Sequence, residues 1–179
     1  MFSSISKIRK RNQSGEGLNR LEFLKQLVKE YKETKSEKSK IESLAKLGNF
    51  AYDPVNYNFL RKVKAIEVFV QSLKESNQKL IELGIGSICN CCIDPYNLII
   101  IEKEDGPSLI LECLFSENEN IIQSSLSIIF FVLSCFESHK FKFDLKIQER
   151  INELIRSQNS QTKNLSSIVN DLIESTKKN

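Results

Sequence analysis

The sequence predicts an all-α fold, a short right-handed α-solenoid, and two observations favour it. The first is the scarcity of helix-breaking residues, since the 179 residues include only six glycines and three prolines, whereas these two types usually make up about 12% of a protein. The second is an internal repeat with a period of 41 residues. A repeat of this length is typical of stacked helical units, each of which buries its apolar face against its neighbours.

The repeat is visible in the polar turns and in the apolar positions. The stretches LAKLGNFAYDPVNYNFLR and IGSICNCCIDPYNLIIIE align with a shift of 41 residues, which pairs Asp53 with Asp94. Steps of three and four residues within each unit place the apolar positions on one helix face. The aligned rows are Leu44, Ile85 and Leu126; Leu47, Ile88 and Ile129; Ala51, Cys92 and Leu133; and Leu73, Leu114 and Ile155.

Each unit is predicted to hold a short, a medium and a long helix. Asp53 and Asp94 can accept hydrogen bonds from the first N–H groups of the next helix, and the proline after each tolerates the first helical position. Short helices are expected over 55–62 and 96–103. Medium helices are expected to follow them, one starting at 64–66 and one over 107–115. The long helices are expected to be capped by Ser76-Asn77 and Asn118 and to end near Cys92 and Cys135. Three helices in about 41 residues are the armadillo pattern, because HEAT repeats have two.

Flanking segments are expected to close this array. An amphipathic helix over 18–33 would cap the first unit, a polar connector over 34–40 would lead into a long helix over 41–51, and residues 1–17 would form a basic tail. The predicted armadillo domain covers 18–176, with repeats at about 37–53, 54–94 and 95–135 and closing helices within 145–176, at 147–157 and 165–175.

Composition disfavours several classes of function. His139 is the only histidine, so a histidine-assisted nucleophile would depend on it, and its polar surroundings favour a solvated turn. The cluster Cys89, Cys91 and Cys92 lacks the paired spacing of a zinc site, so core packing is the simpler interpretation, with Cys92 as a small core residue. We therefore expect no enzyme activity, no cofactor, no metal and no small-molecule substrate. The longest apolar run, 128–133, is far too short to cross a membrane.

An asparagine lies near the end of two long helices and marks a candidate partner-binding face. Asn49 and Asn90 could pair with a peptide backbone through their amides, or could instead bridge the Asp-Pro turn that follows. The third copy has Phe131 at this position, so such a ladder has at most two rungs. Tyr52 has the chemistry of an interface anchor, but it could equally pack on the neighbouring short helix.

The basic residues of the tail, Lys7, Arg9, Lys10 and Arg11, allow three interpretations. They could contact phosphate, act as a nuclear-import patch, or form a solvated end. The net charge of +3 does not decide between these alternatives.

Three stretches resemble the armadillo repeat-containing protein 7 family: LVKEYKETKS at 27–36, LGNFAYDPVNYNFLR at 47–61, and SLKESNQKLIELGIGSICNCCIDPYN at 72–97. The resemblance covers about residues 18–115. It implies a non-catalytic nuclear subunit of the minor (U12-type) spliceosome that pairs with an RNA-recognition-motif protein at the capped 5′ end of the U6-type small nuclear RNA, with indirect RNA contact. The matching residues, taken as a partner-facing ridge, are Asn49, Tyr52, Asp53, Asn56, Tyr57, Arg61, Asn90 and Asp94.

Two further hypotheses stay open at this point. The chain could be a general peptide- or protein-binding adaptor in transport or signalling, in the nucleus or the cytoplasm. It could also bind RNA directly through its tail.

Overall fold

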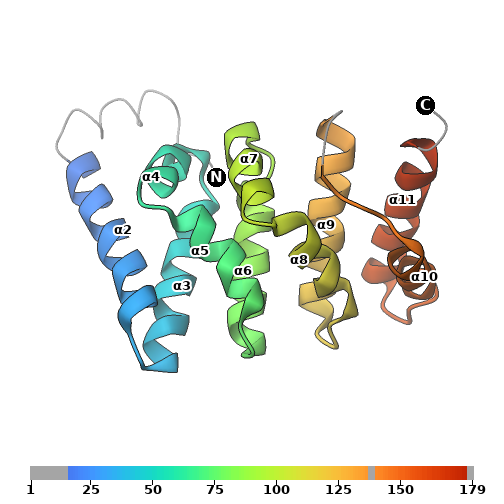
Figure 1. Cartoon of the computed structure of the whole chain (residues 1–179), viewed down its shortest axis with the longest axis horizontal. Coiled ribbons are helices and arrows are strands. Elements are labelled where there is room, and N and C mark those ends of the chain that lie inside the picture. The colour runs from blue at the N-terminus through green and yellow to red at the C-terminus, as the bar shows by residue number, and fades with distance from the viewer. Residues whose placement is uncertain (1–15, 137–139, 177–179) are drawn as a thin grey trace. The chain divides into compact units, whose positions relative to one another are not determined.

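The computed structural model describes residues 16–136 and 140–176, and these ranges contain helices and connecting segments without a β-strand. The chain divides into two compact units, residues 1–91 and 92–179. Each unit is built from the helices that the repeat pattern predicts, and the all-α fold class is confirmed (Figure 1).

In the first unit, the long helix α3 (Glu37–Ala51) lies between α2 (Glu16–Glu33) and α6 (Gln78–Cys91) (Figure 1). Shorter elements connect α3 to α6: η1 (Pro54–Asn56), α4 (Tyr57–Lys62), α5 (Ala65–Gln71) and η2 (Ser72–Lys74). Leu44, Leu47, Ile85 and Ile88 have no exposed surface, which confirms that the apolar rows form the core of this unit.

The second unit continues with α7 (Pro95–Lys103), α8 (Gly106–Glu112), η3 (Cys113–Phe115), α9 (Glu119–Cys135), α10 (Leu145–Leu154) and α11 (Ser160–Thr176). Leu114, Leu126 and Ile129 have no exposed surface, whereas Leu133 and Ile155 are only half-buried. The repeat pattern is weaker here because α9 is followed by the extended segment 140–144 and α10, in place of an Asp-Pro turn and a short helix.

The predicted caps are present in both units. The Asp53 carboxylate accepts from the Val55 N–H at 3.1 Å, and the Asp94 carboxylate accepts from the Tyr96 N–H at 3.0 Å and the Asn97 N–H at 3.1 Å. Asn77 and Asn118 cap α6 and α9 by accepting from the N–H groups of Lys79 and Asn120. These bonds satisfy N–H groups that have no partner within the helix.

Two predicted helix starts were wrong, each because a cap was overlooked. Helix α3 begins at Glu37 instead of residue 41, since the Ser36 hydroxyl accepts from the Ser39 N–H at 3.3 Å, so most of the expected connector is helical. Helix α11 begins at Ser160 instead of residue 165, since the Asn159 side chain accepts from the N–H groups of Gln161 and Thr162.

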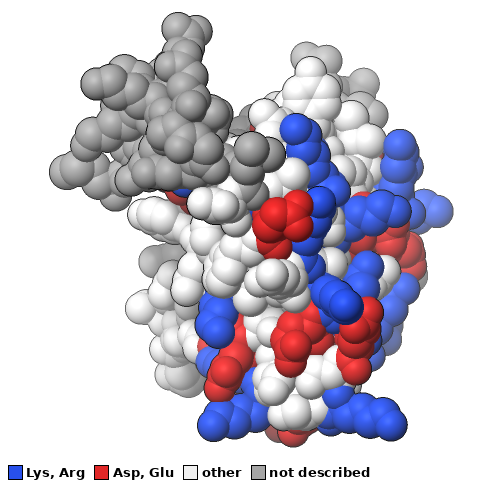
Figure 2. All heavy atoms as spheres, turned by 90° about the vertical axis from the view of Figure 1, so that its left-hand side faces the viewer, with Lys and Arg blue, Asp and Glu red and all other residues white. Residues whose placement is uncertain are grey.

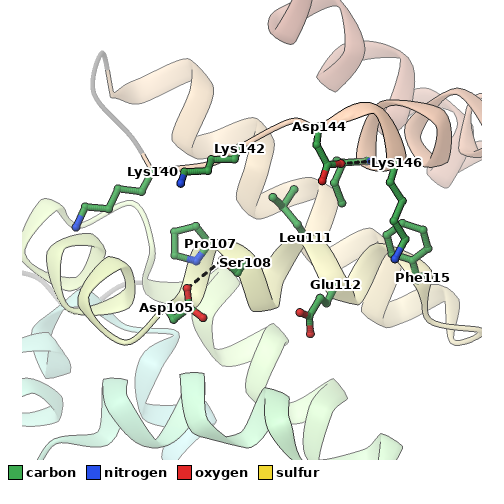
Figure 3. Close-up of a pocket in the computed structure, with 11 residues that line it drawn as sticks. Asp105, Pro107, Ser108, Leu111, Glu112, Phe115, Lys140, Lys142, Asp144 and Lys146 are labelled. Carbon is green, nitrogen blue, oxygen red and sulfur yellow. Dashed lines mark hydrogen bonds between the residues drawn. The ribbon is translucent and has the colours of Figure 1, made fainter.

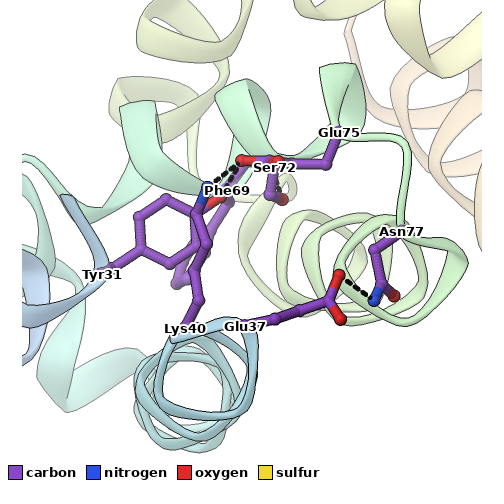
Figure 4. A network of polar contacts seen from close by, with 7 residues as sticks. All are labelled: Tyr31, Glu37, Lys40, Phe69, Ser72, Glu75 and Asn77. Atoms are coloured by element: carbon purple, nitrogen blue, oxygen red, sulfur yellow. Dashed lines mark hydrogen bonds and ion pairs between the residues drawn. The ribbon is translucent and has the colours of Figure 1, made fainter. Parts of the chain in front are cut away.

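A polar network joins three elements of the first unit. The Glu75 carboxylate accepts from the Lys40 ammonium at 2.5 Å and from the Tyr31 hydroxyl at 3.2 Å, and Lys40 Nζ also lies 5.1 Å from the centre of the Tyr31 ring (Figure 4). Nearby, the Asn77 amide donates to Glu37 at 2.7 Å. The network ties α2, α3 and the turn before α6 together at one end of the helices.

This network predicts a loss of stability at alkaline pH. Burial, followed by the nearby Glu75 carboxylate, raises the pKa of the Tyr31 hydroxyl above its ordinary value of 10. The folded chain therefore holds this proton more tightly than the unfolded chain, so the stabilisation is complete below pH 10 and is lost as the pH rises above it. The loss is at most roughly 1.4 kcal/mol per pH unit for one group.

Urea denaturation at a series of pH values from neutral to alkaline, with wild type and Tyr31→Phe side by side, tests this expectation. The wild type should lose more stability than Tyr31→Phe above pH 10. Parallel losses in the two proteins would show that Tyr31 does not carry the effect.

Candidate partner-docking surface

The two ladder asparagines are exposed on adjacent helices of the first unit. Asn49 lies on α3 and Asn90 on α6. The helices approach closely beside them, because a Cβ atom at Gly48 would lie 2.5 Å from the Ser87 hydroxyl oxygen. A glycine at this position lets the two helices pack and brings the asparagines onto one surface.

A small pocket of about 260 Å³ lies beside Asn49 at the end of α3. Its lining combines Asn49, Phe50 and Asp53 with Arg20 from α2. The Arg20 guanidinium donates to the Asn56 side-chain oxygen at 3.1 Å and lies 5.6 Å from the centre of the Phe59 ring. Arg20 is therefore held in place at the rim of the pocket by both contacts.

Aromatic side chains lie on the same two helices as the pocket residues, and one of them, Phe50, lines the pocket. Phe23 is 44% exposed and its ring centre lies 6.0 Å from that of Phe50, while Tyr52, at the end of α3, is 57% exposed. Partly exposed aromatic residues next to an arginine have the composition of protein-interface hot spots. We call Arg20, Phe23, Asn49, Phe50, Tyr52 and Asp53 the docking surface.

Among the described residues, the side of the molecule that carries α2 shows no field of charge of a single sign. Figure 2 shows lysine and arginine interspersed with aspartate and glutamate, separated by uncharged surface. Such a surface favours a protein partner over the phosphate backbone of a nucleic acid, whose binding depends on clustered positive charge.

Two residues of the predicted ridge are buried and hydrogen-bonded within the chain. Tyr57 is only 5% exposed, and its hydroxyl donates to the Asn90 backbone carbonyl at 2.7 Å. Asn56 is 6% exposed, and its amide donates to the Phe50 carbonyl at 2.9 Å. Residue type alone does not distinguish an interface tyrosine from one that fastens two helices together, and the role of both residues in partner binding stays a prediction.

The other predicted residues are distributed differently. Arg61 is half-buried, and its guanidinium donates to the Asn58 side chain within α4. Asp94 belongs to the second unit, where it caps α7. Phe131, the departure from the asparagine ladder, is half-buried, with its ring centre 5.5 Å from that of Phe130.

Arg20 and Phe23 were not predicted from the sequence. Arg20 lies in line with the buried Leu24 and Leu27 on α2 and is half-buried, whereas Phe23 lies beside this apolar stripe and is 44% exposed. The available signal was an aromatic residue outside the stripe of an amphipathic helix. Lys7, Arg9, Lys10, Arg11 and His139 lie outside the described residues.

Four of the five cysteines, Cys89, Cys91, Cys92 and Cys113, are buried or half-buried, and Cys135 is exposed. Cys91 and Cys92 are buried, which confirms Cys92 as a core residue, and burial raises the pKa of the half-buried Cys89 thiol to about 11. Burial, together with the nearby Glu112 carboxylate, raises the pKa of Cys113 to about 12, so both thiols are protonated at neutral pH. Within 16–136 and 140–176 there is no group of three His, Cys, Asp or Glu residues that could hold a metal ion.

No helix in the described part of the chain combines the length and the apolar character needed to cross a membrane.

Solved structures define the class to which this fold belongs. A designed armadillo repeat protein in complex with the peptide (KR)4 aligns with a TM-score of 0.69 and 15% identity, covering 93% of this chain and 68% of that one. A computationally designed armadillo repeat protein for modular peptide recognition aligns with a TM-score of 0.70 and 15% identity, covering 97% and 74%. The chain therefore has the armadillo-repeat fold, an all-α solenoid.

The sequence is similar to that of one particular mouse protein. Armadillo repeat-containing protein 7 of Mus musculus is 46% identical over 72 residues, which are 40% of this chain and 36% of the mouse protein. The resemblance noted from the sequence is thereby confirmed, and the match spans little more than a third of that relative's length. No family model matches the chain.

Proposed function

We propose that this protein is a non-catalytic scaffold that holds a partner protein on the docking surface of its first unit. The observation that carries the proposal is a small pocket lined by Arg20 and Phe50, with the exposed aromatic side chains Phe23 and Tyr52 on the same two helices, Phe23 on α2 and Tyr52 at the end of α3. Tyr52 is 57% exposed, so packing within the chain leaves more than half of its surface in contact with solvent. Anchors of this kind supply most of the affinity of a protein interface once a partner removes them from water.

The scaffold acts in pre-mRNA splicing, in the nucleus, as a subunit of the minor spliceosome. It pairs with an RNA-recognition-motif protein at the capped 5′ end of the U6-type small nuclear RNA, and its own RNA contact is indirect. The likeness to armadillo repeat-containing protein 7 supports this role, since the mouse protein is 46% identical over 72 residues and the stretch 47–61 that resembles the family contains Asn49, Tyr52 and Asp53. Arg61 and Asn90 extend the proposed interface within the first unit, and Asp94 is a separate candidate in the second.

A peptide-binding adaptor is the alternative, and one observation favours it. A structural neighbour of this chain is a designed armadillo protein in complex with the peptide (KR)4. The exposed amides of Asn49 and Asn90 on α3 and α6 would hold a short extended peptide through its backbone. Phe131 limits such a ladder to two rungs, so the peptide would be short.

Purification of the tagged chain from nuclei distinguishes the two functions. The splicing function predicts that an RNA-recognition-motif protein and a U6-type minor small nuclear RNA are recovered together, as measured by mass spectrometry and RNA sequencing. Recovery of unrelated peptides or proteins without RNA would favour the adaptor and exclude the splicing role.

A chain without residues 1–17 tests whether the tail binds RNA directly. If the full chain and the shortened chain bind bare RNA equally weakly, the tail does not provide an RNA site.

Tyr52→Ala is expected to weaken partner recovery about tenfold or more, because losing an interface anchor typically costs at least 2 kcal/mol. The melting temperature should stay within the range of a surface substitution, since Tyr52 is exposed. Tyr96→Ala is the matched control, because Tyr96 is 67% exposed but lies in the second unit, outside the docking surface. Equal recovery with Tyr52→Ala and Tyr96→Ala would contradict the proposed interface.

A further inference from the structure

The second unit contains a groove that the proposed splicing role does not use. It has a volume of about 650 Å³ and is formed by α8 and η3 on one side and by segment 140–144 with the first turn of α10 on the other (Figure 3). All of its lining residues belong to this unit, and the docking surface contributes none of them. The groove therefore requires a separate explanation.

The floor of the groove is apolar and regularly spaced. Pro107 and Leu111 are buried, and Phe115 is 40% exposed; these residues follow one another at intervals of four along α8 and η3. Ile147, at the start of α10, completes the apolar lining. Within α8, Pro107 and Leu111 belong to the kind of ridge against which a second helix packs its own apolar side chains, and Phe115 on the 3-10 turn η3 extends the apolar floor.

The two walls carry opposite charges. Lys140 and Lys142 are exposed on segment 140–144, whereas Asp105 and Glu112 are exposed on the α8 side (Figure 3). Lys146 Nζ lies 4.7 Å from the centre of the Phe115 ring, at one end of the groove.

Two of the carboxylates that line the groove accept hydrogen bonds from within the chain. Asp144, on the lysine side, accepts from the Ile147 N–H at 2.9 Å and caps α10, and Asp105 accepts from the Ser108 hydroxyl at 2.9 Å. The remaining arrangement is an apolar floor between a basic wall and an acidic wall.

We propose that this groove docks an amphipathic helix of a partner protein. Its apolar residues would pack on Pro107, Leu111 and Phe115, with acidic side chains along the lysine wall and basic side chains along the wall of Asp105 and Glu112. The spacing of the floor matches a helix ridge, and the opposed walls match a helix with acidic residues on one flank and basic residues on the other. A nucleic acid fits less well, because Asp105 and Glu112 would repel its phosphates.

Three synthetic helical peptides with the same apolar stripe test this proposal on the full chain. One has acidic and basic flanks, one has two acidic flanks, and one has two basic flanks. Binding is measured by fluorescence anisotropy, and its location by backbone amide NMR shifts. The mixed-flank peptide should bind most tightly and shift the amides of Ser108, Leu111 and Ile147.

Charge reversal of one wall should change the preference of the groove. Glu112→Lys leaves the α8 wall with one acidic and one basic side chain, so this wall should lose its preference for a basic flank. The preference should then move toward the peptide with two acidic flanks by about threefold or more, as expected of partly exposed charge pairs. Lys163→Glu, a reversal at an exposed position of α11 outside the groove, should leave the order of affinities unchanged. Circular dichroism checks that both variants keep their helical content.

The proposal is overturned if none of the three peptides shifts the groove amides. It is equally overturned if Glu112→Lys and Lys163→Glu leave the same order of affinities. Neither result bears on the docking surface of the first unit, so failure here is separable from failure of the proposed splicing role.

Discussion

Ile88→Ala should lower the free energy of unfolding by about 2–5 kcal/mol, the usual cost of truncating a large aliphatic side chain in a core. Ile88 has no exposed surface and belongs to the aligned row that also contains Leu47, another fully buried side chain, for which the same loss is expected on Leu47→Ala. Urea denaturation followed by circular dichroism gives the free energies. Ile93→Ala is the matched control, because Ile93 is 52% exposed and its truncation should cost well under 1 kcal/mol.

Similar losses at Ile88 and Ile93 would mean that the apolar rows do not mark the core. That result would remove the basis of the repeat assignment, since the 41-residue register was inferred from those rows.

Tyr57→Ala should destabilise the chain by about 3–5 kcal/mol, as truncation of a buried aromatic ring usually does. Tyr57 is 5% exposed, and its hydroxyl links α4 to the carbonyl of Asn90 at the end of α6. Tyr57→Phe keeps the ring and removes only the hydrogen bond, so it should cost about 0.5–1.5 kcal/mol. The same denaturation experiment measures both.

Tyr52→Ala serves as the internal comparison for Tyr57, because the two tyrosines are five residues apart and differ mainly in burial, with Tyr52 57% exposed. Its stability should stay within about 0.5 kcal/mol of wild type. A stable Tyr57→Ala protein that no longer recovers its partner would support the prediction that Tyr57 faces the partner.

The helical architecture was predictable because local chemistry and global packing agree in this sequence. Asp53 and Asp94 start helices where their side chains satisfy free N–H groups, and rows such as Leu44, Ile85 and Leu126 are buried as their spacing requires. The backbone conformation at two repeat junctions was harder to predict from the sequence. Lys64 and Asp105, 41 residues apart, both adopt left-handed backbone conformations with φ of 60° and 62°, without the glycine that usually announces such a turn.

The candidate site was less predictable than the fold. Tyr57 and Tyr52 have the same side chain, and only the position of α6 beneath Tyr57 makes one of them structural. Arg20 joins the docking surface because α2 packs beside α3 and α4. This packing brings Arg20 into contact with Asn56, which is 36 positions away in the sequence. Periodicity identifies which face of a helix is buried, but it does not identify which exposed residues from different helices meet.

Hydrogen–deuterium exchange, compared between the free chain and the complex purified from nuclei, tests the central claim most directly. If the first unit holds its partner through the docking surface, backbone amides around Phe23 and from Asn49 to Asp53 should exchange more slowly in the complex. Exchange there that is unchanged on partner binding, with protection confined to other helices, would contradict the account.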